Sequence, residues 1–141
     1  MSREDQLREA ITQRLAAILA QVSDEFASIH PAAGNFFPPA SQLLQGGKRM
    51  RAILADAGYR CARQSDVLAP VIIEFGVALE LFQAAALVHD DIIDDSDSRR
   101  GHPSAHVYFA GLSPSDRAHE ATSFGRNGAI LLGDLLIVLA E

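Results

Sequence analysis

The chain has no excess of positive charge, almost no cysteine and no long uninterrupted apolar run. Its 141 residues carry a formal net charge of -6, which argues against nucleic acid as the main partner, because a phosphate backbone attracts a basic surface. The single cysteine, Cys61, cannot form a disulfide within the chain, as is typical of a reducing compartment. The N-terminal residues lack the apolar core of a signal peptide, and no apolar run reaches the roughly 18 residues of a membrane span. We therefore expect a cytoplasmic protein without a membrane span.

Apolar residues recur at helical spacing in most of the chain. The first such stripe, which predicts an amphipathic helix capped by Ser2, consists of Leu7, Ile11, Leu15, Ile18, Leu19 and Val22. Prolines at positions 38 and 39 interrupt the chain, and further helices are expected over about 48–63, 71–95 and from about 120–128 to the end. No β-alternation is long enough to predict a strand, and residues 96–116 are expected to form a loop with at most one helical turn. The expected fold class is all-α.

The helix expected over residues 71–95 is apolar on nearly every side from Val71 to Val88. Such a helix is usually buried inside a larger core. The chain also ends within an apolar helix, because no glycine or proline stop signal follows residues 135–140. About four helices are too few to cover one another, so we expect a fragment of a larger helical protein. The alternative is a small bundle that dimerises.

The C-terminal end of this helix is acidic: it carries Asp90, Asp91, Asp94 and Asp95, and Asp97 follows it. Asp90 and Asp94 are four residues apart and therefore project from one helix face. The cluster is unfavourable by itself, because like charges at this spacing repel and the helix dipole disfavours anions at the C-terminus. Mg²⁺ would compensate, since it is typically held by one or two carboxylates together with substrate phosphates. The alternative is a solvated acidic helix end.

Two basic elements accompany the aspartates. Arg99-Arg100-Gly101 follows them, and guanidinium groups match phosphate oxygens in geometry; the alternative is that both arginines only neutralise the aspartates. Upstream, residues 46–51 read Gly-Gly-Lys-Arg-Met-Arg, and glycines before a helix allow an anion to approach closely. Lys48 and Arg51 are expected on one helix face, whereas Arg49 is expected to form a structural ion pair. Together these elements predict a site for Mg²⁺ and diphosphate.

These motifs resemble those of the trans-isoprenyl (polyprenyl) diphosphate synthase family. Residues 90–101 match its D-D-x-x-D-x-x-x-x-R-R-G motif at every fixed position, and residues 46–51 match G-G-K-R-x-R, with Ala52 where a proline is usual. Residues 128–136 are similar to a third N-terminal signature, so the resemblance covers most of the chain from about residue 43. It implies that residues 1–141 are a partial polyprenyl synthetase domain, the N-terminal part of the isoprenoid synthase helical bundle, without the C-terminal half and its second aspartate-rich motif.

The resemblance also implies an activity and a role for each matching residue. The enzyme would condense isopentenyl diphosphate with an allylic diphosphate, releasing pyrophosphate and a longer trans-prenyl diphosphate, and it would be a homodimer. Asp90 and Asp94 would bind the Mg²⁺ that holds the allylic diphosphate, with Asp91 in support. Arg99 would contact the same diphosphate during catalysis. Isopentenyl diphosphate would be held by Lys48, Arg51, Gln83 and Arg100.

Product length is implied to depend on Ala85 and Ala86, which precede Asp90 by five and four residues. In the family, bulky aromatic residues at these positions block the product tunnel early. Two alanines therefore predict a geranylgeranyl or longer product, although Phe82, one turn earlier, could act as a floor.

Two other functions were weighed against this one. A terpene cyclase-like enzyme uses a similar aspartate motif but needs no second diphosphate site, so Lys48 and Arg51 argue against it. A non-catalytic subunit of a prenyl synthase is less expected, because the first-motif aspartates are intact. The 141 residues alone are expected to be inactive, since they contain no second aspartate-rich motif. His89 and Asp134 are expected to pack beside the site.

Overall fold

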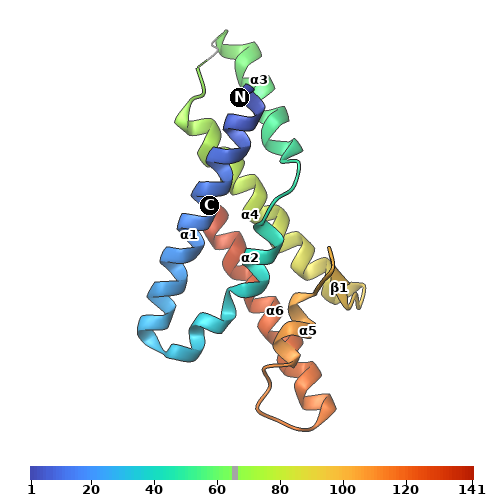
Figure 1. Ribbon diagram of the computed structural model, residues 1–141. Helices are drawn as coiled ribbons and strands as arrows, with labels where there is room; N and C mark the ends of the chain where they lie inside the picture. Colours follow the sequence, from blue (N-terminus) through green and yellow to red (C-terminus); the bar gives the residue numbers. More distant parts are fainter. Residues whose placement is uncertain (65–66) are drawn as a thin grey trace.

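The protein is described here by a computed structural model that covers residues 1–64 and 67–141. Within these residues the chain forms a helical bundle, which confirms the all-α prediction (Figure 1). The elements are α1 (Arg3–Ile29), the 3-10 helix η1 (Pro31–Phe36), α2 (Pro38–Leu44), α3 (Met50–Arg63), α4 (Pro70–Ile93), β1 (Ser98–Arg99), β2 (His102–Pro103), α5 (Ala105–Ala110) and α6 (Ala118–Ala140).

Helix α1 begins with the predicted cap. The Asp5 backbone N–H donates to the Ser2 hydroxyl at 3.2 Å, and the Ser2 backbone N–H donates to the Asp5 carboxylate at 3.2 Å. This reciprocal arrangement satisfies backbone donors that have no partner inside the helix. On the same helix, Arg3 binds Asp56 of α3 at 2.7 Å, and this hydrogen bond is the main cause that holds the pKa of Asp56 below its ordinary value.

Helix α4 is the centre of the bundle and packs against α1, α3 and α6 (Figure 1). Gly76 allows α1 to approach closely, since a Cβ atom there would lie 2.5 Å from Ile11 Cδ1. The buried side of the helix comprises Ile72, Gly76, Val77, Leu81, Ala84, Ala85, Val88 and Asp91. Their burial places Asp91, the second residue of the aspartate cluster, directly on the core.

A second side of α4 is not covered. Val71, Phe75, Phe82 and Ile93 are all exposed, as are Leu131 and Val138 of α6. The helix is therefore not buried on all sides within the described residues. Further helices of a longer protein or a second copy of the chain would each cover this surface, and both remain predictions.

Helices α4 and α6 are both strongly apolar. By length and composition alone, each of them could cross a bilayer. Core helices of soluble proteins satisfy the same criterion, and these two helices pack against each other. The absence of a membrane span therefore stays a prediction.

The loop expected over residues 96–116 contains two elements that were not located in advance. Strands β1 and β2 pair antiparallel, with Ser98 opposite Pro103 and Arg99 opposite His102. Arg100 and Gly101 have φ of 55° and 82°, which is the positive-φ geometry of a tight two-residue hairpin turn. Strands of two residues are too short to produce an alternating pattern, so the sequence did not reveal them. The single helical turn that was allowed for is α5.

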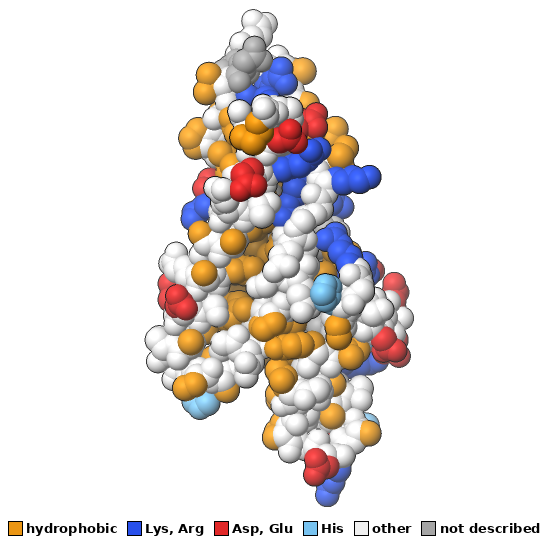
Figure 2. All heavy atoms as spheres, in the orientation of Figure 1, with side chains coloured by type: hydrophobic (Ala, Val, Ile, Leu, Met, Phe, Trp, Pro, Cys, Tyr) orange, Lys and Arg blue, Asp and Glu red, His pale blue; other side chains and the backbone are white. Residues whose placement is uncertain are grey.

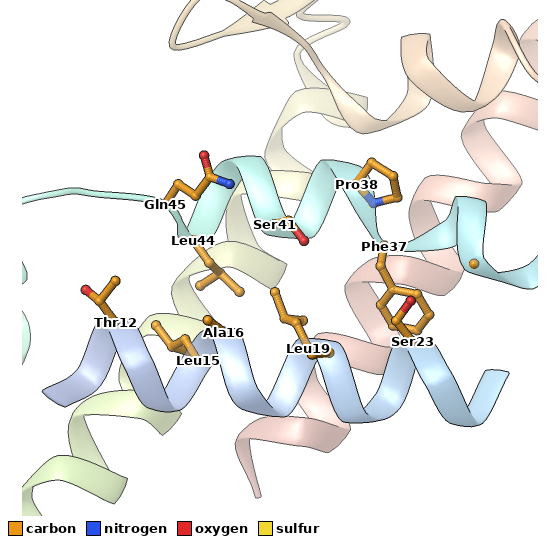
Figure 3. Close-up of a pocket in the computed structure, with 12 residues that line it drawn as sticks. Thr12, Leu15, Ala16, Leu19, Ser23, Phe37, Pro38, Ser41, Leu44 and Gln45 are labelled. Atoms are coloured by element: carbon orange, nitrogen blue, oxygen red, sulfur yellow. The ribbon is translucent and has the colours of Figure 1, made fainter. Parts of the chain in front are cut away.

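A cavity of about 360 Å³ lies between α1 and α2 (Figure 3). Leu15 and Leu19 of α1, Leu44 of α2 and Phe37, which precedes α2, line it. None of the described lining residues is charged, so the cavity does not suit a diphosphate.

Candidate diphosphate and metal site

Asp90 and Asp94 lie at the C-terminal end of α4, and both are exposed. Asp94 caps the helix, and its backbone N–H donates to the Asp90 carbonyl oxygen at 2.8 Å. The two residues are therefore separated by one helical turn, as the four-residue spacing predicted. The helix itself ends at Ile93, two residues earlier than expected.

Asp91 is only 1% exposed, unlike Asp90 and Asp94. Arg99 Nε donates to both Asp91 carboxylate oxygens at 2.8 and 3.0 Å, and Arg99 Nη2 donates to Asp91 Oδ1 at 2.6 Å. A longer contact of 3.4 Å joins Arg99 Nη2 to Asp90 Oδ2. The hydrogen bond with Asp91 is the main cause that raises the pKa of Arg99, so the guanidinium stays charged. Arg99 therefore neutralises the buried carboxylate and reaches the edge of the exposed pair.

The hairpin turn directs Arg100 away from the aspartates and toward α2. Arg100 Nη1 donates to the Leu43 carbonyl oxygen at 3.3 Å, at the C-terminal end of α2. The aspartate-neutralising contact that was weighed as an alternative is thus present for Arg99, whereas Arg100 contacts a backbone carbonyl. Since Arg99 keeps a side-chain exposure of 29%, its pairing with Asp91 leaves part of the group open to solvent.

Residues 45–49 form the basic loop, which connects α2 to α3. Gly46 and Gly47 have φ of 69° and 94°, and Arg49 has φ of 49°. Because of these left-handed conformations, α3 begins only at Met50. The prediction that Lys48 and Arg51 share one helix face was therefore wrong, since Lys48 precedes the helix. Both Lys48 and Arg51 are nevertheless exposed.

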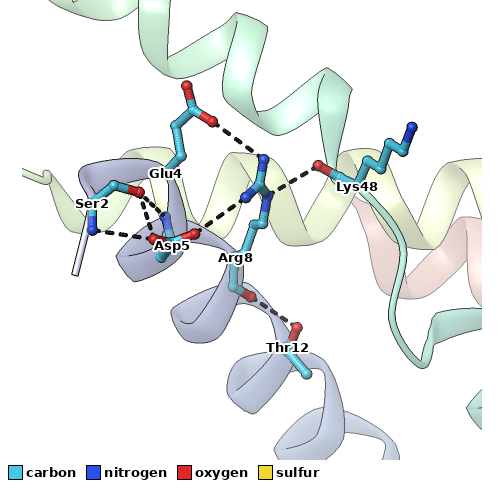
Figure 4. A network of polar contacts seen from close by, with 6 residues as sticks. All are labelled: Ser2, Glu4, Asp5, Arg8, Thr12 and Lys48. Carbon is cyan, nitrogen blue, oxygen red and sulfur yellow. Dashed lines mark hydrogen bonds and ion pairs between the residues drawn. The ribbon is translucent and has the colours of Figure 1, made fainter.

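Lys48 is held through its backbone. Arg8 of α1 donates from Nε to the Lys48 carbonyl oxygen at 3.3 Å, and it also pairs with Glu4 and Asp5 at 3.2 and 3.3 Å (Figure 4). The Lys48 side chain extends away from this network in Figure 4. Its ammonium group is therefore presented to solvent while the backbone is fixed.

Arg49 forms the structural ion pair that was predicted for it. Its Nη1 donates to Glu80 Oε2 of α4 at 2.6 Å, and its Nη2 donates to the Leu44 carbonyl oxygen at 2.5 Å. Glu80 was not singled out from the sequence. The available signal was that only two carboxylates, Glu74 and Glu80, interrupt the apolar stretch of α4, and Glu80 lies three residues before Gln83.

Both basic elements are attached to α2. The neighbouring carbonyls of Leu43 and Leu44 accept from Arg100 and Arg49 respectively. Figure 2 shows Lys and Arg side chains gathered on the side of the molecule where the basic loop and the hairpin lie. Gln83 is half-buried on α4 between Glu80 and the aspartates. The basic loop and the hairpin that follows the acidic helix end therefore both contact the C-terminal end of α2.

The two residues linked with product length lie in different environments. Ala85 is buried, at 1% exposure, whereas Ala86 is exposed. Phe82, Ala86 and Asp90 follow one another at four-residue steps and are all exposed. Ala86 therefore shares the open side of α4 with Asp90, and Ala85 belongs to the core.

His89 packs at the acidic end of α4, as expected, whereas the Asp134 side chain is mostly exposed. The His89 ring lies against Gly133 of α6 so closely that Gly133 has no space for a side chain. Its Nε2 atom lies 3.4 Å from the Ile130 carbonyl oxygen and 3.7 Å from Asp134 Oδ1. The contact ties the acidic end of α4 to α6.

The carboxylates fit the expected metal only in part. Residues 1–64 and 67–141 contain no group of three or more His, Cys, Asp or Glu side chains arranged to hold a metal ion. Mg²⁺ is typically bound through one or two carboxylates plus substrate phosphates and water. Asp90 and Asp94 supply such a pair, while Asp91 is occupied by Arg99. The donor set therefore fits Mg²⁺ that is bound together with a diphosphate.

Comparisons with known proteins agree with this geometry. A family model described as "Polyprenyl synthetase" matches residues 35–141. A "Probable farnesyl diphosphate synthase" from Sinorhizobium fredii is 41% identical over 95 residues, covering 66% of this chain and 23% of the relative. A "Short chain isoprenyl diphosphate synthase" from Methanocaldococcus jannaschii is 31% identical over 124 residues, covering 87% of this chain and 32% of the relative.

A solved structure shows the same fold. The crystal structure of a geranylgeranyl pyrophosphate synthase from Corynebacterium glutamicum, complexed with isoprenyl diphosphate and magnesium, is similar with a TM-score of 0.80 and 30% identity. The match covers 99% of this chain and 40% of that one. The chain spans less than a third of the length of the first two relatives. The match over residues 35–141, which include both charged motifs, shows that the chain belongs to the polyprenyl synthetase family.

Proposed function

We propose that the complete gene product is a cytoplasmic, Mg²⁺-dependent trans-prenyltransferase. It condenses isopentenyl diphosphate with an allylic diphosphate to give a geranylgeranyl or longer prenyl diphosphate. The observation that carries the proposal is the exposed pair Asp90 and Asp94, which lie one turn apart at the end of a core helix. Arg99 donates a hydrogen bond to Asp90 of this pair. The names of the relatives, which are farnesyl, geranylgeranyl and short-chain isoprenyl diphosphate synthases, support the reaction class.

In this proposal the side chains act mainly on charge. Asp90 and Asp94 would hold the Mg²⁺ that binds the allylic diphosphate, and the metal would supply positive charge beside the leaving group. The exposed edge of Arg99 donates to the same diphosphate. Fixed positive charges of this kind stabilise a departing anion without reorganising during the reaction.

The second diphosphate would be bound by the basic elements. Lys48 and Arg51 are exposed beside the two glycines, and Arg100 lies at the neighbouring hairpin turn. Gln83 would add a hydrogen bond from α4. The allylic carbon–oxygen bond would break, the isopentenyl double bond would attack the resulting cation, and a proton would be lost. A terpene cyclase has no use for this second anion site.

Product length would depend more on Ala86 than on Ala85, because only Ala86 lies on the open side of α4. Ala86→Phe should shorten the main product, since the ring would fill the space that a growing chain uses. Ala85→Phe should instead overpack the core and lower stability by roughly 1–3 kcal/mol. Chromatography of the products and a thermal melt of each variant measure the two effects; a shorter product from Ala85→Phe alone would contradict the assignment.

Assembly as a homodimer is also proposed, on the basis of the family. The exposed apolar residues of α4 and α6 offer surface that a second copy could cover. Sedimentation of the complete gene product gives the mass of the assembly, and a monomer at micromolar concentration would contradict this part of the proposal.

The decisive test is a product assay on the complete gene product. Labelled isopentenyl diphosphate is supplied with Mg²⁺ and, in turn, with each of a short series of allylic primers of increasing chain length. Label should enter a longer prenyl diphosphate only when both a primer and Mg²⁺ are present. Release of a hydrocarbon without use of isopentenyl diphosphate would indicate a cyclase. No turnover by the purified protein, restored by a partner subunit, would indicate a non-catalytic component.

A further inference from the structure

Arg49 is an arginine in an unfavourable position. Its side chain is 2% exposed, although arginine is rarely buried to this extent. Its backbone is left-handed at φ 49° and ψ 36°, a conformation that is unfavourable for a non-glycine residue. Its Nε atom is buried and has no hydrogen-bond partner among the described residues. Three costs at one residue require compensation by its other contacts.

The compensation comes from two contacts that point in different directions. Nη1 donates to Glu80 Oε2 at 2.6 Å, and Glu80 itself has a side-chain exposure of 13%. Nη2 donates to the Leu44 carbonyl oxygen, which lies in the last turn of α2 and has no partner within that helix. One guanidinium therefore joins the start of α3 to α2 and to the middle of α4.

The pair spans the two halves of the proposed site. Arg49 is next to Lys48 and two residues from Arg51, so its position determines where the basic loop lies. Glu80 is on the same helix as Gln83 and ten residues before Asp90, a separation of about 15 Å along a rigid helix. Contact between Arg49 and Glu80 thus relates the basic loop to the helix that carries the aspartates.

We propose that the Arg49–Glu80 pair is a positioning device that sets the spacing between the two diphosphate-binding halves of the site. The inference rests on the proposed function, because it concerns two substrates bound at once. Neither residue touches substrate. They act through Lys48 and Arg51, whose exposed charges they hold in the position that binds the diphosphate of isopentenyl diphosphate.

A role in stability alone explains the pair less well. Replacing a buried ion pair by apolar residues of similar volume is often neutral or stabilising, because desolvation of two charges offsets their attraction. An unsatisfied Nε and a left-handed backbone add further cost. Apolar side chains cannot fix the orientation of the loop, whereas a guanidinium with two hydrogen-bond partners fixes both a distance and an angle.

The test uses the complete gene product with Glu80→Gln, which keeps the shape of the side chain and removes its charge. The KM for isopentenyl diphosphate should rise about tenfold, the change expected when one charged hydrogen bond no longer aligns the loop. The KM for the allylic substrate and kcat should stay within about twofold, because the aspartate end of α4 is untouched.

Glu74→Gln is the matched control: Glu74 is on the same helix and pairs with Arg14 at 2.9 Å, but that pair is exposed. Glu74→Gln should leave all three constants unchanged.

A second variant separates position from stability. The double variant Arg49→Met with Glu80→Leu removes both charges and should melt near the wild-type temperature, yet it should keep the raised KM for isopentenyl diphosphate. A wild-type KM in this variant, or equal rises in both KM values for Glu80→Gln, would overturn the proposal.

A third measurement does not depend on turnover. Hydrogen exchange in the peptide covering residues 44–51 should become faster in Glu80→Gln, while exchange in residues 128–136 should not change. If the wild-type protein fails to turn over, the proposed function fails, but the exchange result still decides whether the pair holds the loop. Unchanged exchange at residues 44–51 would overturn the inference.

Discussion

The acidic end of α4 and the basic loop before α3 both combine one buried, ion-paired residue with exposed charged neighbours, but the backbone produces this arrangement differently in each. In each region one charged residue is buried in an ion pair, Asp91 with Arg99 and Arg49 with Glu80, while its neighbours are exposed. On α4 the arrangement follows from helix geometry, because successive residues are rotated by about 100° and Asp91 turns inward between its neighbours. In the loop it follows from positive-φ conformations at Gly46, Gly47 and Arg49.

This difference predicts how each region should respond to change. The exposed aspartates are fixed by a 24-residue helix that packs against α1, α2, α3, α5 and α6, so a substitution there should remain local. The exposed cations of the loop are fixed by a few contacts at the loop itself. A substitution there should move the neighbouring side chains, and its effect should reach substrate binding even when the changed residue contacts no substrate.

The largest expected effect is on the exposed aspartates. Asp90→Asn or Asp94→Asn in the complete gene product should lower kcat by about 10³-fold, since loss of a metal ligand removes several kcal/mol of charge stabilisation. Thermal stability should hardly change, because both side chains are exposed. Initial rates at saturating substrate measure the effect.

Asp95→Asn is the matched control for these two variants. Asp95 is also exposed and acidic, but its side chain pairs with Arg126 of α6 at 2.9 Å and does not share the face of Asp90. Its kcat should match the wild type. A loss in Asp95→Asn as large as that in Asp90→Asn would mean that general acidity, rather than the one-turn pair, is what matters.

The second effect concerns stability rather than rate. Asp91→Ala should destabilise the fold by about 3 kcal/mol, near the lower end for breaking a buried pair, because the released Arg99 remains partly exposed. Urea unfolding at neutral pH measures this. Asp97→Ala, at an exposed position in the same segment, should change the free energy of unfolding by at most about 0.5 kcal/mol. Equal stability of the two variants would remove the distinction between buried and exposed aspartates.

The same comparison shows which features could be predicted from sequence. The helices, the Ser2 cap and the exposed pair Asp90 and Asp94 follow from periodicity and spacing, which are local properties. The burial of Asp91 and the inward position of Ala85 depend on which side of α4 meets the core, and that is settled by packing with other helices. The spacing of residues within a motif does not contain this information.

The basic loop was less predictable for a related reason. A helix beginning at Lys48 was a reasonable expectation, but positive φ at Arg49 delays it to Met50. That conformation is held by Glu80, which lies 31 residues away in the sequence. Long-range contacts of this kind are outside the reach of a local pattern, even though the pairing of Arg49 with some carboxylate was expected.

The third effect should be a change in binding without a change in stability. Lys48→Met keeps the length of the side chain and removes the exposed charge, so the KM for isopentenyl diphosphate should rise about tenfold while the melting temperature stays the same. Steady-state kinetics with each substrate varied in turn measures it. Arg63→Met, an exposed cation at the other end of α3, should change neither constant; a similar rise there would show that net charge, not the loop, attracts the substrate.

The smallest effect isolates the backbone of the loop. Gly47 has φ of 94°, and a Cβ atom there would meet nothing within 4 Å, so Gly47→Ala introduces no clash. Any loss in the free energy of unfolding should come from the backbone conformation alone and amount to about 1–2 kcal/mol, as measured by urea unfolding. Gly34 also has open space around its Cβ position, but it does not have a positive φ in the left-handed range, so Gly34→Ala should be neutral or slightly stabilising. Gly101 repeats the test in the hairpin at φ 82°. We expect Gly47→Ala and Gly101→Ala to lower the free energy of unfolding equally, but only Gly47→Ala to raise the KM for isopentenyl diphosphate. That result would mean that the backbone of the basic loop, and not that of the hairpin, affects substrate binding. Equal kinetic effects of the two variants would mean that the two basic elements behave as one unit.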